Sequence, residues 1–517
     1  MNKFFLRKKT PIEMDDKVNT FSRSSGVLIH ISSLPGPYGI GEIGSRIRWF
    51  IDILAKMNQK YWQFLPTNYP ENYNSPYDTN SAFAQNPMLI GLDDLIDKGL
   101  IQEEDLKPIP NFSKSKIDFE KLIKWKKPIL SKAVSAFLKS EKKELQKYEK
   151  FCEENFFWLE DYAVFMVLKD INKNQSWVNW DPQEKNLDPM CITAIKKKES
   201  EKIQKVKVLQ YLFFSQWKKL KRYANSKGVA LIGDIPIYVS YNSADVWGNK
   251  NLFKLNMDGE MIVQSGCPPD NFMTTGQVWG HPIYDWEKHH DTNFEWWCQR
   301  MKYLNQLVDV IRIDHFNGFA KYWEIPAKDN TGARGKWQNS LGELLLKTLY
   351  DDNKNINLIA EDLGEAAKDA AIIMDKYNIP GMQVLQFSFD DDSIQNINEN
   401  IVLYTGTHDN ETSVQWFQSI IQECIEKKIN EKEKRIKSIL GKDLNNIHWS
   451  MISFCMDSNA SIVIFPMQDL LGLGQEGRMN IPGTVGDQNW TWRMERDSID
   501  EKLIKKMSDL TKETYRS

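Results

Sequence analysis

The sequence predicts an α/β protein built on a (β/α)₈ barrel, with a large helical insertion and loop insertions at the C-terminal mouth. Eight short apolar runs each end in a polar or glycine-containing turn, as buried parallel strands do. Segments with apolar residues at helical spacing separate them, and this alternation is typical of a parallel barrel. The predicted strands are Gly26–Ile31, Tyr61–Leu65, Val229–Asp234, Val308–Asp314, Asn357–Glu361, Met382–Phe387, Ile401–Gly406 and Ser461–Phe465.

The clearest helical patterns between these runs are Gly44–Met57 and Leu341–Tyr350. A doubly wound open sheet is the alternative architecture, because it also alternates strands with helices. Its usual glycine-rich first turn is absent. The GxGxxG pattern at Gly39–Gly44 lies several residues beyond the first predicted strand, so it is weak evidence of a dinucleotide site.

The predicted strands are unevenly spaced, and this predicts how the domains are organised. About 160 residues separate the second strand from the third, far more than an ordinary connection. Residues 67–228 are rich in charge and helical pattern, so we expect a mainly helical insertion there. Residues 240–300 are rich in aromatic and turn residues, and we expect an active-site loop insertion. Residues 1–22 are expected to form an N-terminal extension, and residues 23–517 the catalytic barrel.

Charge and cysteine usage narrow the classes of function. Lys and Arg number 67 and Asp and Glu 70, so the net charge of −3 offers no electrostatic footprint for nucleic acid or an anionic membrane surface. The six cysteines form no CxxC pair, which favours reduced thiols over a zinc site. No apolar run is long enough to cross a bilayer. We expect a cytoplasmic protein without a nucleic-acid or membrane partner.

Acidic residues stand at, or just beyond, the ends of four predicted strands. They are Asp234, Asp314, Glu361 and Asp409, and Arg312, His315 and His408 accompany them. The C-terminal ends of barrel strands converge on one mouth, so these side chains are expected to meet there. One such residue alone could simply cap the following helix. Four together are electrostatically costly, and that cost is typical of sites where shifted pKa values serve chemistry.

Two kinds of chemistry fit such a cluster. Carboxylates and histidines bind divalent metals, although the sequence contains no HxH or HExxH pattern. In glycosidic chemistry, one carboxylate attacks the anomeric carbon and a protonated carboxyl gives its proton to the leaving oxygen, about 5 Å apart in retaining enzymes. Arg312 would keep Asp314 ionised as the nucleophile. Glu361, repelled by neighbouring charge, would hold its proton as the acid.

Ten segments carry a resemblance to a known family. In chain order they are GVLIHISSLPGPYGIGEIG, YWQFLP, NSPYDTNSAFAQNP, GDIPIYV, CPPDNF, GQVWGHPIYDW, VIRIDHFNGF, IAEDLG, GTHDNET and QDLLGLGQEGRMNIPG. With them the sequence resembles the amylomaltase or disproportionating-enzyme family, the 4-α-glucanotransferases of glycoside hydrolase family seventy-seven. The resemblance runs from about Gly26 to Arg493. It implies transfer of a 1,4-α-glucan segment to the 4-position of glucose or another glucan, by retaining double displacement through a covalent glycosyl-enzyme intermediate.

The resemblance also implies roles for individual residues, with no cofactor and no metal. Asp314 matches the family's nucleophile, Glu361 its acid/base and Asp409 the carboxylate that grips the distorted sugar. The substrate-binding residues that it implies are Tyr77, Arg312, His408, Asp270, Phe272, Gln277, Trp279 and Asn480, supported by Asp234 and His315. The implied partners are maltooligosaccharides and 1,4-α-glucans. The sequence departs from the family at Asn271, where many relatives carry tyrosine, and at His281, where asparagine is common.

Other functions share some of these features. A glucan hydrolase would use the same catalytic groups and differ only in letting water resolve the intermediate. A non-catalytic glucan-binding protein is disfavoured, because all three catalytic carboxyl positions are filled. A metal-dependent barrel enzyme is the third alternative.

Overall fold

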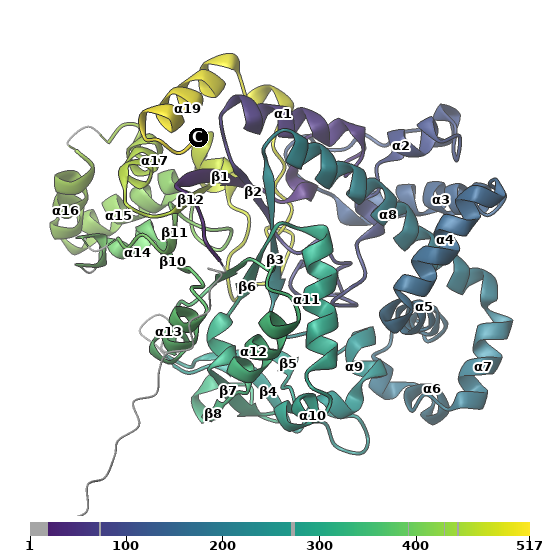
Figure 1. Cartoon of the computed structure of the whole chain (residues 1–517). Coiled ribbons are helices and arrows are strands. Elements are labelled where there is room, and N and C mark those ends of the chain that lie inside the picture. Colours follow the sequence, from purple (N-terminus) through teal and green to yellow (C-terminus); the bar gives the residue numbers. More distant parts are fainter. Residues whose placement is uncertain are drawn as a thin grey trace, which may run out of the picture.

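The computed structural model describes residues 19–71, 74–269, 274–364, 366–390, 392–395, 397–428, 430–441 and 444–517. Eight parallel strands form its central sheet, in the spatial order β10-β11-β12-β1-β2-β3-β6-β9 (Figure 1). These strands are β1 (Ser24–Leu28), β2 (Tyr61–Phe64), β3 (Ala230–Pro236), β6 (Val310–Asp314), β9 (Leu358–Ala360), β10 (Gly381–Val384), β11 (Ile401–Tyr404) and β12 (Ile462–Pro466). Each overlaps one strand predicted from the sequence.

The sheet closes almost completely into a ring. Its end strands β9 and β10 are joined by a hydrogen bond from Ala360 N to Pro380 O of 2.9 Å. Fully buried side chains such as Ile232, Ile311 and Leu403 belong to the hydrophobic core. The predicted (β/α)₈ barrel is therefore confirmed, and the open-sheet alternative is wrong.

Seven of the eight predicted strands end one to three residues away from the observed strand ends, β10 and β3 among them. β10 stops at Val384, and the helical turn α14 (Leu385–Ser388) replaces the end of the predicted strand Met382–Phe387. Ser388 Oγ donates to Val384 O at 3.2 Å, which supplies a local partner for a carbonyl that would otherwise face the end of the sheet. β3 instead continues past Asp234 to Pro236, since it pairs with β6 as far as Asp314.

Helices surround the barrel and complete its alternation. Trp217 shows how closely they pack, because its buried indole N–H donates to Leu307 O at 2.9 Å. The helices are α1 (Arg48–Lys56), α9 (Ala244–Gly248), α10 (Trp286–Asp291), α11 (Glu295–Leu307), α12 (Gly342–Asp352), α13 (Ala367–Lys376), α15 (Ser413–Lys427), α16 (Glu431–Leu440), α17 (Ile447–Asp457), α18 (Met467–Leu470) and α19 (Glu501–Glu513). Among the described residues, no helix combines the length and apolar character needed to span a membrane.

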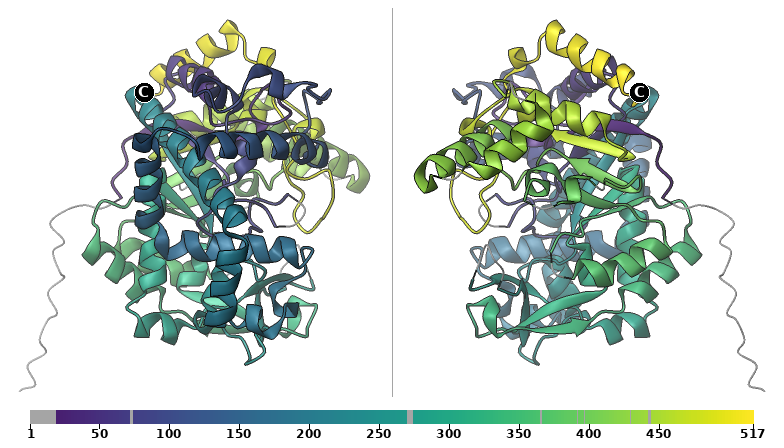
Figure 2. Two further views of the ribbon diagram at one scale, coloured as in Figure 1. Left: turned by 90° about the vertical axis from the view of Figure 1, so that its right-hand side faces the viewer. Right: turned by 90° about the vertical axis from the view of Figure 1, so that its left-hand side faces the viewer.

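Between β2 and β3 the chain is mainly helical. Its helices cover one side of the barrel, opposite the side covered by α15 and α17 (Figure 2). They are α2 (Leu92–Asp97), α3 (Phe119–Phe137), α4 (Lys142–Glu154), α5 (Phe156–Ile171), α6 (Pro182–Lys185), α7 (Pro189–Lys198) and α8 (Ser200–Ser226). The buried Lys126 of α3 anchors them, since its ammonium binds Glu42 and donates to the carbonyls of Met88 and Ile90, both at 2.8 Å.

A second, antiparallel sheet lies beside the barrel and was not predicted from the sequence. Its strands run in the order β5-β4-β7-β8. They are β4 (Val263–Cys267), β5 (Gln277–Pro282), β7 (Lys321–Pro326) and β8 (Lys336–Asn339). β4 and β5 precede barrel strand β6, whereas β7 and β8 follow it, so this sheet forms only once the chain has folded back on itself. β5 carries two of the predicted substrate-binding residues, Gln277 and Trp279.

Candidate active site

Strands β3 and β6 bring the first two predicted carboxylates together. In the parallel register Asp234 lies opposite Arg312 and Pro236 opposite Asp314, so the three charged side chains neighbour one another. Arg312 Nη1 lies 2.6 Å from both carboxylate oxygens of Asp234 and 2.9 Å from Asp314 Oδ1. One guanidinium therefore contacts two carboxyl groups.

Exposure separates the roles that these two carboxylates can take. The Asp234 side chain is 0% exposed, whereas the Asp314 side chain is 32% exposed. Only Asp314 can meet a molecule arriving from solvent. Asp234 instead binds Arg312 and accepts a hydrogen bond from the Tyr77 hydroxyl at 2.9 Å.

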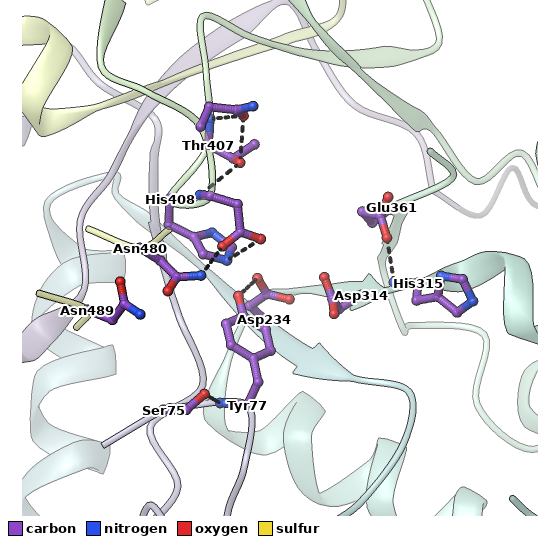
Figure 3. Close-up of polar contacts among 12 residues, drawn as sticks. Ser75, Tyr77, Asp234, Asp314, His315, Glu361, Thr407, His408, Asn480 and Asn489 are labelled. Atoms are coloured by element: carbon purple, nitrogen blue, oxygen red, sulfur yellow. Dashed lines mark hydrogen bonds and ion pairs between the residues drawn. The ribbon is translucent and has the colours of Figure 1, made fainter. Parts of the chain in front are cut away.

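Glu361 follows β9 and lies next to Asp314 in the sheet. Ile313 pairs with Ala360, and Glu361 N donates to Ile313 O at 3.0 Å, so the following residues of the two strands stand side by side. The His315 amide donates to Glu361 Oε2 at 2.7 Å, and the Leu363 amide donates to Oε1 at 3.0 Å. In the view of Figure 3, the Asp314 side chain lies between those of Asp234 and Glu361.

The environment of Glu361 favours its protonated form. Burial is the largest influence, and the charge of Asp314 adds to it, which together raise the pKa of Glu361 from 4.5 to about 8. Arg312 and the two amide hydrogen bonds act in the opposite direction without cancelling this rise. At neutral pH the Glu361 carboxyl is therefore mostly protonated.

The backbone around His315 is unusual and contributes to this arrangement. His315 has φ +54° and ψ +49°, a left-handed conformation that is uncommon outside glycine and typical of functional sites. That turn directs its amide toward Glu361. Burial lowers the pKa of the His315 imidazole to about 4, so the ring is neutral at neutral pH.

The fourth predicted acidic residue, Asp409, follows β11. Its side chain is 46% exposed, the most open of the acidic group. Asn480 Nδ2 donates to Asp409 Oδ1 at 2.7 Å, and His408 Nε2 lies 3.5 Å from Oδ2. The segment around Asn480 thus orients this carboxylate, while its remaining surface stays available.

Aromatic rings flank the carboxylates. The ring of Tyr77 stacks on the His408 ring, with centroids 5.2 Å apart and an angle of 12° between the planes. The ring of Trp490 completes the group, with its centroid 5.8 Å from that of Tyr77 and 6.0 Å from that of His408. The sequence analysis did not single out Trp490, because no spacing relates it to either partner. Its only sequence signal was the high aromatic content.

The predicted acceptor side is described in part. Trp279 packs edge-on against His315 with ring centroids 4.8 Å apart, and its indole N–H donates to Gln277 Oε1 at 3.0 Å. Asp270 and Phe272, two other predicted substrate-binding residues, lie outside the described residues.

The carboxyl groups of the candidate site form ion pairs and hydrogen bonds with other side chains of the protein. Among the described residues, no group of three or more His, Cys, Asp or Glu side chains could hold a metal ion. Asp234 and Asp314 contact a guanidinium, and Asp409 contacts an amide.

Comparison with known proteins identifies the family. The model of the family described as 4-alpha-glucanotransferase matches residues 29–499. The chain is 38% identical over 496 residues to the 4-alpha-glucanotransferase of Streptococcus pneumoniae, covering 95% of this chain and 96% of that protein. It is 40% identical over 492 residues to that of Clostridium butyricum, covering 94% and 99%. This chain belongs to the 4-alpha-glucanotransferase family.

A solved member of the 4-alpha-glucanotransferase family shares the whole architecture. The amylomaltase from Streptococcus agalactiae, solved in complex with acarbose, superposes with a TM-score of 0.91 at 35% identity, covering 96% of this chain and all of that one. The chain is thus a glycosyltransferase that acts on α-1,4-glucans. The resemblance inferred from the sequence motifs is confirmed.

Proposed function

We propose that this 4-alpha-glucanotransferase works by retaining double displacement, with Asp314 as nucleophile, Glu361 as acid/base and Asp409 as the transition-state stabiliser. The observation that carries the proposal is the pairing of two unlike carboxyl groups on adjacent strands. Arg312 Nη1 lies 2.9 Å from Asp314 Oδ1, whereas burial and the neighbouring Asp314 favour the protonated form of Glu361.

In the first step, Asp314 Oδ attacks the anomeric carbon of a 1,4-α-glucan while Glu361 donates its proton to the glycosidic oxygen. The glucan beyond the broken bond leaves with a new 4-hydroxyl, and its former partner remains bound to Asp314 as an ester. In the second step, Glu361, now ionised, takes the proton of an acceptor 4-hydroxyl. The acceptor oxygen attacks the same carbon and releases the Asp314 carboxylate.

Asp409 and Tyr77 would bind the sugar at the point of cleavage. Hydrogen bonds from ring hydroxyls to Asp409, which Asn480 holds at 2.7 Å, are expected to strengthen as the ring flattens toward the oxocarbenium-like state. The Tyr77 ring, backed by His408 at 5.2 Å, offers an aromatic face on which a sugar ring can stack.

The substrates would be maltooligosaccharides and longer 1,4-α-glucans, with glucose or another such glucan as acceptor. The names of the relatives and the acarbose-bound amylomaltase support this choice. An acceptor sugar already bound near Trp279 would compete with water through its high effective concentration. We also propose a cytoplasmic location within maltodextrin, glycogen or starch metabolism; the six free cysteines support a reducing compartment.

A product profile from pure maltotriose tests the activity. Transfer yields glucose and maltopentaose with no net gain of reducing ends, whereas new reducing ends without longer glucans would replace the transferase by a hydrolase.

The mechanism needs a separate experiment. Glu361→Gln protein treated with α-maltotriosyl fluoride, whose leaving group needs no proton, should accumulate a covalent maltotriosyl adduct on the peptide containing Asp314. Mass spectrometry of the digest locates it. An adduct on another residue, or Asp314→Asn protein with full transfer activity, would contradict the assignment.

A further inference from the structure

A cavity of about 500 Å³ lies between helices α3, α5 and α8 and the segment that follows β2. None of the four acidic residues of the candidate active site lines it. Its volume is in the range of small-molecule sites. Part of its wall is apolar, formed by Met88, Leu130, Met166, Val167, Val206 and Leu209.

Four lysines also line this cavity, and two of them have an acidic partner. Lys169 binds Glu71, and Lys202 lies 3.0 Å from Glu199. Within the part of the chain that the structure describes, neither Lys127 nor Lys205 forms an ion pair with a carboxylate. Lys205 donates to the Ser131 hydroxyl.

The two unpaired ammonium groups act on each other. Burial lowers the pKa of Lys205, and the charge of Lys127 lowers it further, while Asp170 opposes this effect from α5. An anion placed between Lys127 and Lys205 would replace this repulsion by two charge-assisted hydrogen bonds.

Two tyrosines supply further polar groups at the cavity. Tyr162 is 2% exposed and lines the cavity together with Tyr69. The side chains interact electrostatically, since Tyr69 contributes to the raised pKa of Tyr162. No hydrogen bond from either hydroxyl to another described residue is present, so both remain available to a ligand.

We propose that this cavity binds a small organic phosphate, whose phosphate group lies between Lys127 and Lys205 and whose organic part lies against the apolar wall. A phosphate monoester carries a charge of about −1.5 to −2 at neutral pH, which matches two unpaired ammonium groups. The tyrosine hydroxyls can donate to the remaining phosphate oxygens.

The same cavity adjoins the segment that carries Tyr77. Lys169 contacts both ends of that segment, since its ammonium binds the Glu71 carboxylate and donates to Asn80 Oδ1 at 2.7 Å. Glu71, Asn80 and Lys169 all line the cavity. A bound phosphate near Lys169 would weaken the ion pair between Lys169 and Glu71. The position of the Tyr77 ring, and therefore its contact with the glucan, would change. This regulatory part rests on the proposed role of Tyr77, whereas the binding site does not.

Calorimetry with phenyl phosphate tests the site. We expect saturable 1:1 binding, weaker binding of inorganic phosphate, and none of phenol. The Lys127→Ala/Lys205→Ala variant should lose affinity about ten-fold or more. Lys124→Ala is the matched control, because Lys124 is exposed on the same helix and does not line the cavity. Its affinity should equal that of the unmodified protein. Urea denaturation of each variant verifies that the fold is intact.

The proposed site would be refuted if phenyl phosphate showed no saturable binding, or if the double variant bound it as tightly as the unmodified protein does. Asp314→Asn protein separates this proposal from the catalytic one, since it should lose transfer and still bind phenyl phosphate. If maltotriose displaces phenyl phosphate from that variant, the cavity is a glucan site and the phosphate assignment is wrong. Phenyl phosphate should change the KM for maltotriose in the unmodified enzyme but not in the double variant. Binding without any kinetic effect would overturn the regulatory role.

Discussion

Replacing Glu361 with glutamine should make the protein more stable at alkaline pH. In the folded protein the pKa of Glu361 is raised to about 8, so the fold disfavours its ionised form. The unmodified protein therefore loses stability as the pH rises from 4.5 to about 8, because the unfolded chain releases this proton first. Glutamine has no proton to release, so the variant should not show this loss.

The size of the effect follows from the pKa. Raising the pKa from 4.5 to about 8 can lower the free energy of unfolding by at most about 5 kcal/mol, at about 1.36 kcal/mol per pKa unit. Water reaches part of this carboxyl, so we expect the free energy of unfolding of Glu361→Gln to exceed that of the unmodified protein by about 1–3 kcal/mol at pH 8.5. At pH 5 the two should differ by less than about 1 kcal/mol.

Urea denaturation at pH 5 and pH 8.5 measures this difference. Glu423→Gln is a suitable control, because Glu423 is an exposed residue of α15 paired with Lys427. Its substitution should change the free energy of unfolding by less than about 0.5 kcal/mol at either pH. A Glu361→Gln variant that is no more stable than the unmodified protein at pH 8.5 would refute the raised pKa.

The same pKa sets the pH dependence of activity. At pH 7 a carboxyl with a pKa of about 8 is protonated in about ten of eleven molecules, whereas at 4.5 the fraction would be about one in three hundred. Transfer from maltotriose should therefore decline above about pH 8, as the general acid loses its proton. In Glu361→Gln the rate should fall about 10²–10⁴-fold. If activity instead declines as the pH rises from 4 to 5, Glu361 is not the general acid.

Substitutions at three positions test the surroundings of the site and the anchor of the helices between β2 and β3. Arg312→Met leaves the fully buried Asp234 without its partner and should lower the free energy of unfolding by about 3–5 kcal/mol in urea titrations; a loss below about 1 kcal/mol contradicts this. Tyr77→Phe keeps the ring, so the KM for maltotriose should change less than about three-fold, whereas Tyr77→Ala should raise it about ten-fold; equal effects would exclude stacking. Lys126→Met leaves the buried carboxylate of Glu42 without its ammonium partner, so it should lower the free energy of unfolding by about 3–5 kcal/mol. The kinetics of the folded enzyme should be unchanged.

Much of the fold could be predicted from local patterns. Each barrel strand is a short apolar run buried on both faces, so its identity is visible without knowledge of its neighbours. The antiparallel sheet could not be found in this way. Its edge strand β8 reads KWQN and is mostly exposed, so only pairing with β7 makes it a strand. The limits of the domains and the N-terminal extension remain predictions.

The order of residues along the chain was enough to predict that acidic residues follow barrel strands, and therefore that Asp314, Glu361 and Asp409 would share one mouth. It did not determine their protonation states. Those depend on through-space contacts between residues far apart in the chain, such as Arg312 with Asp234, and on how much water burial removes. Likewise, no sequence pattern could place Trp490 beside Tyr77, or bring Lys127 and Lys205 of two separate helices to one cavity. Only tertiary packing sets these distances, and the free energy of a charge depends on distance and solvent exposure.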